Sequence, residues 1–416
     1  MYAAWILPVQ HFPDGHRPLE DASLAVSRCA LRELYILGMQ TSPMRRSISL
    51  DVLRGLAVLL VIGRHYEYRW LWYKIGWSGV DLFFVLSGYL IAGLIFREFQ
   101  QTGTIDLKRF WIRRGFKIYP GFYAMIIYVI VYYLGLGKLT FHIFSDLFFL
   151  QDYITPIASH GWSLGVEEKF YFALPILLLV LIRTHKKSTD PFSAIPYLFI
   201  LFFVVCLVLR INAVAGRSPW DEIYRPAHLR MDCLFAGVCI GYFKEFRPEA
   251  FRRIGSLRLW IPATVLLAPI AIFDLDTPAM VTFGFSAASL GFASLVLWLD
   301  NRTLPDWRFF ACVAWIGRYS YPIYLWHLIV KSKLGYSEAN WGLVSLPFYV
   351  ATSIGVGWLM GYLVEAPFLK LRDKFFPART SGSIPSLAAS PYLESASRDA
   401  TADDQALPRP LCARPE

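Results

Sequence analysis

Two basic side chains of different chemistry stand eleven residues apart in one apolar stretch of the sequence. The stretch is LDVLRGLAVLLVIGRHY, and the two side chains are Arg54 and His65. Eleven residues of an α-helix turn to within about 20° of the starting direction and rise about 16 Å, so both side chains face the same way. Ionisable groups inside a membrane helix are costly and usually mark a pathway or a site. We therefore expect Arg54 and His65 to lie at the two ends of a transmembrane reaction path.

The chemistry open to this pair is acid–base and electrostatic. An imidazole exchanges protons near neutral pH, which makes His65 a candidate general base. Asp51 precedes Arg54 by three residues, close enough to pair with it on one helix face. We expect Asp51 to be structural, whereas Arg54 can also contact an anionic substrate. The alternative is that the ion pair and the imidazole only fix helix packing.

A second group of candidates is a cluster of cations in the segment FWIRRGFKIYPGFY. Arg113, Arg114 and Lys117 lie about one helical turn apart. Arginine pairs with phosphate oxygens through its planar fork, so the cluster could hold the phosphates of a nucleotide-like donor. The same cluster could instead anchor the protein on anionic headgroups, and spacing alone favours this alternative.

The segment HGWSLGVEEKFYFALP holds two adjacent glutamates at the start of an apolar stretch. Adjacent helical residues point about 100° apart, so one of Glu167 and Glu168 can face a bundle interior while the other pairs elsewhere. The alternative is a structural ion pair with Lys169 or with an arginine. Residues 161–165 also match the G-x-S-x-G pattern of hydrolases. That site needs a strand before its serine, whereas here a loop leads into a membrane helix, so we reject it.

Two further positions are candidates with a strong packing alternative. Ser87 precedes Gly88 in GVDLFFVLSGYLI, and this pair either exposes backbone to a ligand or, as we expect, permits close helix packing. His327 stands in the stretch GRYSYPIYLWH, where packing and function both explain it. Gly357 and Gly361 form a G-x-x-x-G pattern, which predicts close helix packing.

The composition indicates a membrane protein. Hydrophobic residues make up 56% of the chain, charged residues only 17%, and the mean hydropathy is +0.43. Apolar runs long enough to cross a hydrocarbon core of about 30 Å recur along the chain. The six cysteines have no metal-ligand spacing, so we expect small buried side chains rather than disulfides or ligands. We predict an all-α polytopic protein with ten spans, at about residues 47–66, 77–97, 118–136, 163–182, 192–211, 228–243, 258–273, 279–299, 312–330 and 343–364.

The distribution of cations predicts the orientation of these spans. If the N-terminus is cytoplasmic, the inner segments contain 23 lysines and arginines and the outer segments 10. The positive-inside rule then places both termini in the cytoplasm. The net charge of +10 therefore reflects topology and attraction to anionic headgroups rather than nucleic-acid binding.

The two ends of the chain are expected to lie outside the membrane domain, which we place at residues 44–376. Residues 1–43 form an N-terminal extension that is either disordered or precedes the true start at Met44 or Met39. Residues 377–416 are rich in Ser, Ala, Pro and charge, which predicts a disordered cytoplasmic tail.

Seven segments, taken together and in this order, resemble the integral-membrane acyltransferase 3 family. They are LDVLRGLAVLLVIGRH, GVDLFFVLSGYLI, FWIRRGFKIYP, WSLGVEEKFYF, RMDCLFAG, YSYPIYLWH and VEAPF. The resemblance runs from about Ser47 to Phe376. The chain departs from the family in its long N-terminal extension and in Lys117, which stands where arginine is commoner.

The resemblance implies a ten-helix enzyme that moves an acyl group, often acetyl, from cytoplasmic acyl-CoA to an extracytoplasmic or lipid-linked glycan. The family's pattern of Arg, ten residues and His maps onto Arg54 and His65, and its R-R-x-x-R/K motif onto Arg113, Arg114 and Lys117. Its SGF/YLI motif maps onto Ser87–Ile91, and its WSL-x-VE-E motif onto Trp162–Glu168. The remaining residues expected to bind substrate or support the site are Asp51, Ser87, Trp162, Ser163, Glu168 and His327.

The mechanism implied by the resemblance places the donor phosphates on the three cations, while the thioester enters the bundle. His65 then either activates the acceptor hydroxyl or briefly carries the acyl group. Arg54 orients the donor or stabilises the oxyanion, and Glu167 holds the acceptor or tunes His65. The donor substrate is acetyl-CoA or another acyl-CoA, and no metal is expected.

The expected location is the inner, cytoplasmic membrane. Some family members carry a fused SGNH-type hydrolase domain, for which this chain has no room. We expect it to act alone or with a separate periplasmic partner. Two alternatives remain open: a small-molecule acceptor for the same chemistry, and a transporter or flippase that moves a lipid-linked sugar with the same buried charges.

Overall fold

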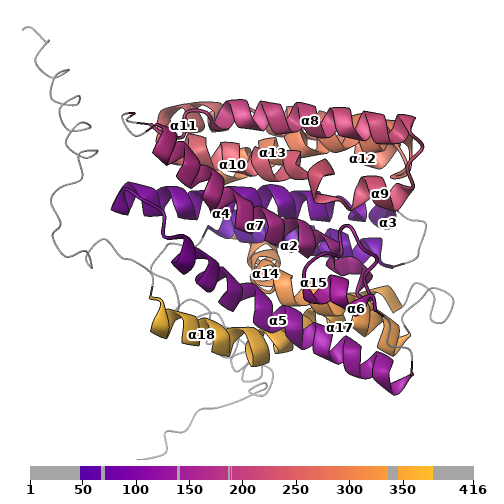
Figure 1. Ribbon diagram of the computed structural model, residues 1–416. Coiled ribbons are helices and arrows are strands. Elements are labelled where there is room, and N and C mark those ends of the chain that lie inside the picture. Colours follow the sequence, from indigo (N-terminus) through magenta and orange to yellow (C-terminus); the bar gives the residue numbers. More distant parts are fainter. Residues whose placement is uncertain are drawn as a thin grey trace, which may run out of the picture. The chain divides into compact units, whose positions relative to one another are not determined.

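The computed structural model describes residues 47–66, 71–137, 141–185, 188, 190–335 and 345–377 of the chain. Within these residues every regular element is a helix, which confirms the all-α prediction (Figure 1). The predicted extension at 1–43 and nearly all of the predicted tail lie outside the described residues.

Each of the ten predicted spans overlaps helical residues, but the span predicted at 312–330 covers parts of two helices, α14 and α15. The long helices are α2 (Ile48–Arg64), α4 (Gly79–Thr102), α5 (Leu107–Gly135), α7 (Trp162–Thr184), α8 (Ile195–Ala215), α10 (Met231–Phe246), α12 (Trp260–Ile272), α13 (Phe285–Asp300), α15 (Ser320–Leu334) and α17 (Ser345–Met360). Shorter elements join or extend them: α3 (Leu71–Gly76), α6 (Ile143–Leu147), η1 (Ser159–Gly161), α9 (Trp220–Tyr224), η2 (Ala227–Leu229), α11 (Pro248–Ser256), η3 (Met280–Gly284), α14 (Arg308–Arg318), η5 (Gly361–Glu365) and α18 (Ala366–Phe375).

The protein is a multi-pass membrane protein. In the described part of the chain, five helices are long and apolar enough to cross a bilayer, or six if α11 and α12, which meet at 74°, form one broken span. The predicted number of ten is larger because several helices are shorter or more polar. For example, α2 has 17 residues and α15 has 15, and α7 carries charges near its start. Ten spans and cytoplasmic termini therefore stay predictions.

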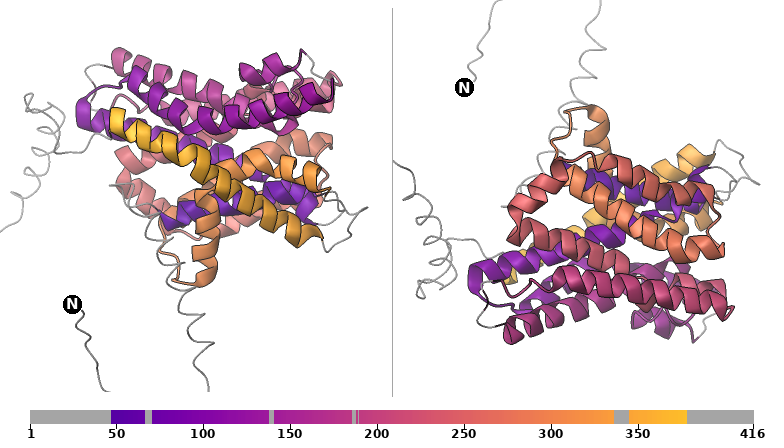
Figure 2. Two further views of the ribbon diagram at one scale, coloured as in Figure 1. Left: turned by 90° about the horizontal axis from the view of Figure 1, so that it is seen from below. Right: turned by 90° about the horizontal axis from the view of Figure 1, so that it is seen from above.

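The helices run side by side in a bundle with two distinct ends. Figure 1 shows α11 and α18 toward one end and α3, α6 and α9 toward the other; we call these the α18 end and the α9 end. In Figure 2, α17, η5 and α18 follow one another as a single long helix along the bundle. The apolar window of the span that includes α4 is 83% buried, against 11% for α8 and 22% for the span that starts with α17. The bundle is therefore built around α4, while α8 and α17 lie at its surface.

The central contact, between α4 and α10, depends on two glycines. A Cβ added to Gly88 would lie 1.9 Å from the carbonyl oxygen of Leu234, and one added to Gly237 would lie 2.1 Å from that of Val85. The two backbones approach this closely only because neither residue has a side chain. The prediction that Ser87-Gly88 permits close packing is thus confirmed.

The G-x-x-x-G pattern of the last span also marks a close approach, as predicted. A Cβ on Gly357 would lie 2.6 Å from the Cα of Ile323 in α15, and one on Gly361 would meet the Tyr319 ring at 3.0 Å. This packing fixes α15 between α17 and the rest of the bundle, and α15 carries His327.

A short turn at the α18 end sets the position of the cation cluster. Helix α4 ends at Gly103, whose φ of 71° lies in the left-handed region that favours glycine. Helix α5 then starts at Asp106, whose side chain accepts the backbone N–H of Arg109 at 3.1 Å. The cap places Arg113, Arg114 and Lys117 in the second and third turns of α5.

We predict that Gly88→Val and Gly237→Val destabilise the bundle, because each added side chain must displace backbone of the facing helix. Overpacking typically costs about 1–3 kcal/mol. The measurement is the apparent melting temperature of the detergent-solubilised protein, followed by size-exclusion chromatography. Gly355→Ala is the control, since nothing lies within 4 Å of its added Cβ. Equal melting temperatures for all three variants would contradict the packing argument.

Candidate active site

Three histidines from three elements meet at the α9 end. The Nδ1 of His65, just after α2, lies 3.1 Å from the Nε2 of His327 in α15, and their ring centroids are 4.9 Å apart. The ring of His160, in η1, lies 5.4 Å from that of His327. The structure therefore brings together two predicted site residues, His65 and His327, and adds His160.

Backbone carbonyls define which ring nitrogens of the cluster carry protons, because a carbonyl can only accept. The Nδ1 of His65 lies 2.9 Å from the Val61 oxygen, and the Nδ1 of His327 lies 2.6 Å from the Tyr324 oxygen. Both nitrogens therefore donate, and the single Nδ1–H of His65 is shared between the Val61 oxygen and the Nε2 of His327, which accepts. The Nε2 of His65 then keeps its lone pair, as a general base requires.

Contacts of the loop before α7 hold His160 in place. The Nε2 of His160 donates to the Leu325 carbonyl oxygen at 3.0 Å, and the side chain of Gln151 donates to the Gly161 carbonyl oxygen at 3.0 Å. Asp146 accepts the Ile157 backbone N–H at 2.8 Å, and burial raises the pKa of the Asp146 carboxyl to about 6. The loop is thereby fixed to α15 and α6.

No described group of histidine, cysteine, aspartate and glutamate side chains could hold a metal ion. Each of the three imidazoles points one protonated nitrogen at a backbone carbonyl, which leaves that nitrogen without a lone pair for a metal. The other nitrogen of each ring can take part in proton exchange or hydrogen bonding.

A cavity of about 190 Å³ adjoins the histidine cluster at the α9 end. Its lining includes His65, His160, Arg64 and Tyr324. The guanidinium of Arg64 stacks 4.3 Å from the Tyr73 ring, which helps to position it. A reactant in this cavity would therefore meet a basic imidazole and a fixed cation.

A second polar cluster lies further along α7, around Glu167. His160, Ser163, Glu167 and Tyr171 are spaced by three or four residues and share one face of the chain segment that forms η1 and α7. The Ser163 hydroxyl bonds the Tyr324 hydroxyl at 2.7 Å, and the Tyr171 hydroxyl donates to Glu167 at 2.9 Å. This polar face links the histidine cluster to the middle of the bundle.

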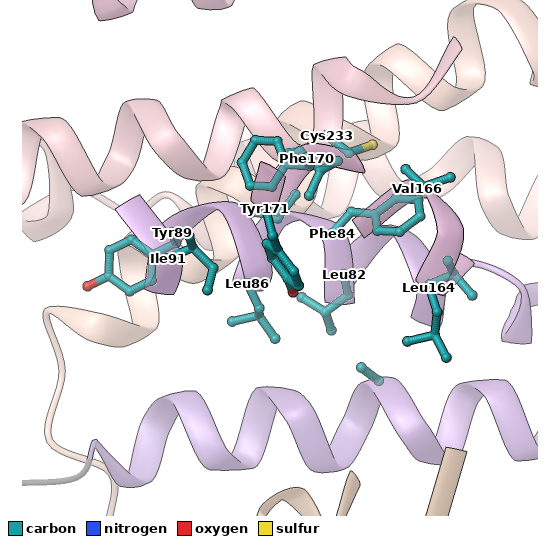
Figure 3. Close-up of a cluster of buried hydrophobic side chains, with 14 of the residues drawn as sticks. Leu82, Phe84, Leu86, Tyr89, Ile91, Leu164, Val166, Phe170, Tyr171 and Cys233 are labelled. Carbon is teal, nitrogen blue, oxygen red and sulfur yellow. The ribbon is translucent and has the colours of Figure 1, made fainter. Parts of the chain in front are cut away.

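Tyr171 connects α7 to α4 and α5. Its hydroxyl bonds that of Ser87 in α4, and the Arg114 guanidinium lies 5.6 Å from its ring centroid. Figure 3 shows the Tyr171 ring directed away from Phe170 and Cys233, so adjacent residues of α7 serve different sides of the helix. Glu168 accepts from Tyr119 at 3.1 Å. Glu167 thus neighbours Ser87 and Arg114 rather than His65.

Lys169 does not pair with either glutamate, contrary to the predicted structural alternative. Its amine bonds Asp152 at 2.5 Å and the Phe149 carbonyl oxygen at 2.7 Å. Glu167 and Glu168 therefore have tyrosine partners instead.

Arg54 lies in the second turn of α2, and His65 directly follows the last residue of that helix. Arg54 forms an ion pair with Asp51, which confirms that these two residues pair. The Arg318 guanidinium lies 3.8 Å from the second oxygen of Asp51. Asp51 is buried, whereas the Arg54 side chain is 25% exposed, so Arg54 remains accessible to a ligand.

The predicted cation cluster contacts the last helix of the described chain. Lys117 pairs with Glu365, and Arg113 lies 3.6 Å from Asp373 and donates to the Phe376 carbonyl oxygen. Arg114 points inward, within electrostatic reach of Glu167 and Glu168. The structure therefore divides the cluster into two surface cations and one interior cation.

Two buried ion pairs tie α4, α8 and α10 together. Arg230 bonds Asp81, and Arg210 bonds Asp232 at 2.7 Å; all four side chains are fully buried. These four charges are therefore internal to the bundle.

The match to known proteins covers most of the described bundle. Residues 47–362 match the model of an acyltransferase domain family, which is the acyltransferase 3 family. The chain belongs to this family. No solved structure matches the chain.

Several relatives of this acyltransferase 3 chain are named as O-acetyltransferases. The peptidoglycan O-acetyltransferase OatA of Listeria monocytogenes is 29% identical over 307 residues, 67% of this chain and 48% of OatA. A putative peptidoglycan O-acetyltransferase of Bacillus subtilis is 28% identical over 67% of this chain and 47% of its own. A putative O-acetyltransferase of Staphylococcus aureus is 26% identical over 81% and 60%. The chain thus spans about half the length of the curated relatives it matches.

Sequence reasoning missed several residues of this acyltransferase 3 site. His160 had a detectable signal, because it precedes Ser163 by three residues and Glu167 by seven on one helix face. Trp77 and Tyr224, which line the cavity, had no comparable signal, because elements distant in sequence bring them together.

We predict that Arg230 and Asp81 stabilise the fold and do no chemistry. Arg230→Met or Asp81→Leu alone leaves a buried charge unpaired, which costs about 3–5 kcal/mol, whereas the double variant is close to neutral. The measurement is membrane abundance together with the apparent melting temperature. Asp274→Asn, which breaks an exposed pair with Lys74, is the neutral control. A double variant as unstable as the singles would contradict this assignment.

Proposed function

We propose that the protein is a membrane O-acyltransferase that moves an acetyl group from cytoplasmic acetyl-CoA to a sugar hydroxyl of an extracytoplasmic or lipid-linked cell-wall polysaccharide. The observation that carries the proposal is His65, an oriented imidazole with a free Nε2 lone pair that lines a cavity. The names of the relatives support acetyl as the acyl group and a peptidoglycan-type acceptor.

The reaction needs one base, one cation and no covalent intermediate. The Nε2 of His65 takes the proton of the acceptor hydroxyl while its oxygen attacks the thioester carbonyl carbon. The Arg64 guanidinium, which also lines the cavity, stabilises the oxyanion that forms. The carbon–sulfur bond then breaks, and the proton passes from His65 to the CoA thiolate. The products are an acetyl ester and free CoA.

The proton on Nδ1 of His65 supports this step. When Nε2 gains the acceptor's proton, the resulting cation is hydrogen-bonded to the Val61 carbonyl oxygen and to the lone pair of His327. Both contacts strengthen with the positive charge, because charge-assisted hydrogen bonds are the stronger ones. His327 is therefore a positioning residue for His65.

The length of the donor fits the spacing of α2. The arm between the pyrophosphate and the sulfur of CoA has about as many chain atoms as four residues, which reach about 14 Å when extended. Eleven helical residues separate Arg54 from His65, a rise of about 16 Å. A donor whose phosphates lie near the level of Arg54 can therefore deliver its thioester to His65. Arg54 contacts the donor, and oxyanion stabilisation falls to Arg64.

The surface cations of α5 complete the donor site. Arg113 and Lys117 are about one quarter to one third exposed, and their carboxylate partners lie on the last helix. Such half-exposed ion pairs contribute little stability, so phosphate oxygens can displace them. Arg114 and Glu167 then lie on the path of the arm toward His65. In this proposal the α18 end faces the cytoplasm, where acetyl-CoA is found.

We predict that His65→Ala lowers acetyl transfer at least about 100-fold without changing the amount of protein in the membrane, because the general base is lost. The measurement is ester-linked acetate released by mild base from the envelope glycans of a deletion strain that expresses each form. His327→Gln, which keeps an acceptor near the position of Nε2, should retain more activity than His327→Phe. Equal acetate from wild type and His65→Ala would refute the role of His65.

We further predict that the double variant Arg113→Ala/Lys117→Ala raises the KM for acetyl-CoA about tenfold or more. Each charge-assisted hydrogen bond to a phosphate contributes about 1.5–3 kcal/mol, and about 1.4 kcal/mol is a factor of ten. The measurement is acetyl-CoA-dependent release of CoA thiol by the purified protein at two salt concentrations. Arg252→Ala/Arg253→Ala removes two cations of α11 and is the matched control. A KM unchanged in the first variant would exclude this phosphate site.

A further inference from the structure

We infer that the cavity beside His65 is the acceptor subsite and that it takes a single sugar ring stacked on aromatic side chains. This inference rests on the proposed function and deepens it, because it names where and how the acceptor binds. The cavity joins residues from α2, α4, η1, α7, α9 and α15.

Five tryptophan and tyrosine side chains line the cavity. Trp220 and Tyr224 of α9 stack with ring centroids 4.8 Å apart at 20°, and Trp162 lies 4.8 Å from Tyr224. Trp77 and Tyr324 also line the cavity. The face of an aromatic ring carries negative charge density, and the C–H groups on the flat face of a sugar ring carry the opposite sign. A wall of this kind is suited to a pyranose ring.

Trp77 contributes a buried indole N–H to the cavity lining. Its side chain is 2% exposed, and its indole N–H has no hydrogen-bond partner among the described residues. A buried donor without a partner costs free energy, so a bound ligand that supplies an acceptor is favoured there. The hydroxyl and ring oxygens of a sugar are such acceptors.

Polar side chains at the cavity provide the remaining contacts of a sugar site. Asp221 and Arg225 pair at 3.1 Å and lie beside Trp220, and Asp221 is exposed. Carboxylate and guanidinium groups bind sugar hydroxyls as acceptor and donor. Since Trp162 and His160 are buried while Ser159 and Asp221 are exposed, the cavity leads from the surface of the α9 end to the histidines.

The size of the cavity limits the ligand to about one ring. Its volume of about 190 Å³ lies below the roughly 300–1,000 Å³ typical of pockets for drug-sized ligands. A longer glycan would therefore place one residue beside His65 and leave the rest of its chain outside. The acceptor then approaches from the α9 end, opposite the donor phosphates.

The test uses Trp220, which lines the cavity and is partly exposed. Wild type, Trp220→Ala, Trp220→Phe and Trp307→Ala are expressed at equal levels in the deletion strain, and radiolabelled acetate is followed into base-labile esters of the glycan and lipid fractions. Trp307 is 63% exposed and precedes α14, outside the cavity lining, so its variant is the matched control. Purified samples of each form are tested for CoA binding.

We expect Trp220→Ala to slow acetate incorporation into glycan about tenfold, since loss of an aromatic contact costs of order 1 kcal/mol beyond its buried area. Trp220→Phe should recover most of the rate, and CoA binding should stay unchanged in all forms. Equal rates for Trp220→Ala and Trp307→Ala would overturn the assignment of the cavity as the acceptor subsite. Ester label confined to lipids that carry no sugar would overturn the sugar as the acceptor. A wild type that adds no ester acetate would instead refute the proposed function.

Discussion

A bundle surrounded by hydrocarbon offers no water to its buried charges, so each of them needs a partner or a use. This protein meets that constraint in two ways. Arg210 and Arg230 are fully buried and are matched by Asp232 and Asp81, which ties three helices together. The α4–α10 contact, which the pair of Arg230 and Asp81 joins, is also the one that Gly88 and Gly237 permit. His65 is different, because its hydrogen bonds occupy one ring nitrogen and leave the other for chemistry.

The local sequence was sufficient to predict contacts and separations within a single helix. The eleven-residue interval between Arg54 and His65 predicts their separation, and the three-residue interval between Asp51 and Arg54 predicts their ion pair, which the structure contains. Helix geometry has a fixed period, so such statements need no knowledge of neighbouring helices. Hydropathy likewise indicated where apolar helices lie, and five or six of those in the described residues are long and apolar enough to cross a bilayer.

Contacts between segments that are distant in sequence could not be predicted from helix geometry and hydropathy. The approach of His327 to His65 joins residues 262 apart, and Lys169 found its partner in Asp152 rather than in the adjacent glutamates. How the helices pack decides which of several possible partners a side chain contacts. The packing depends in turn on glycines such as Gly357, whose role can be recognised only when the facing helix is known. The residues that line the cavity come from five or more elements, so no local sequence pattern could predict the cavity.

The hydrogen bonds of the histidine pair have a consequence for the membrane as an electrical barrier. A proton that reaches His65 could pass to the lone pair of His327, but the other nitrogen of His327 already donates to the Tyr324 carbonyl oxygen, which cannot release a proton onward. The His65–His327 pair therefore cannot conduct protons onward through the bundle. In the proposed mechanism, the proton taken from the acceptor leaves with a product, so turnover moves no net charge across the bilayer through this cluster. The proposed chemistry would then not dissipate the ion gradient across the membrane.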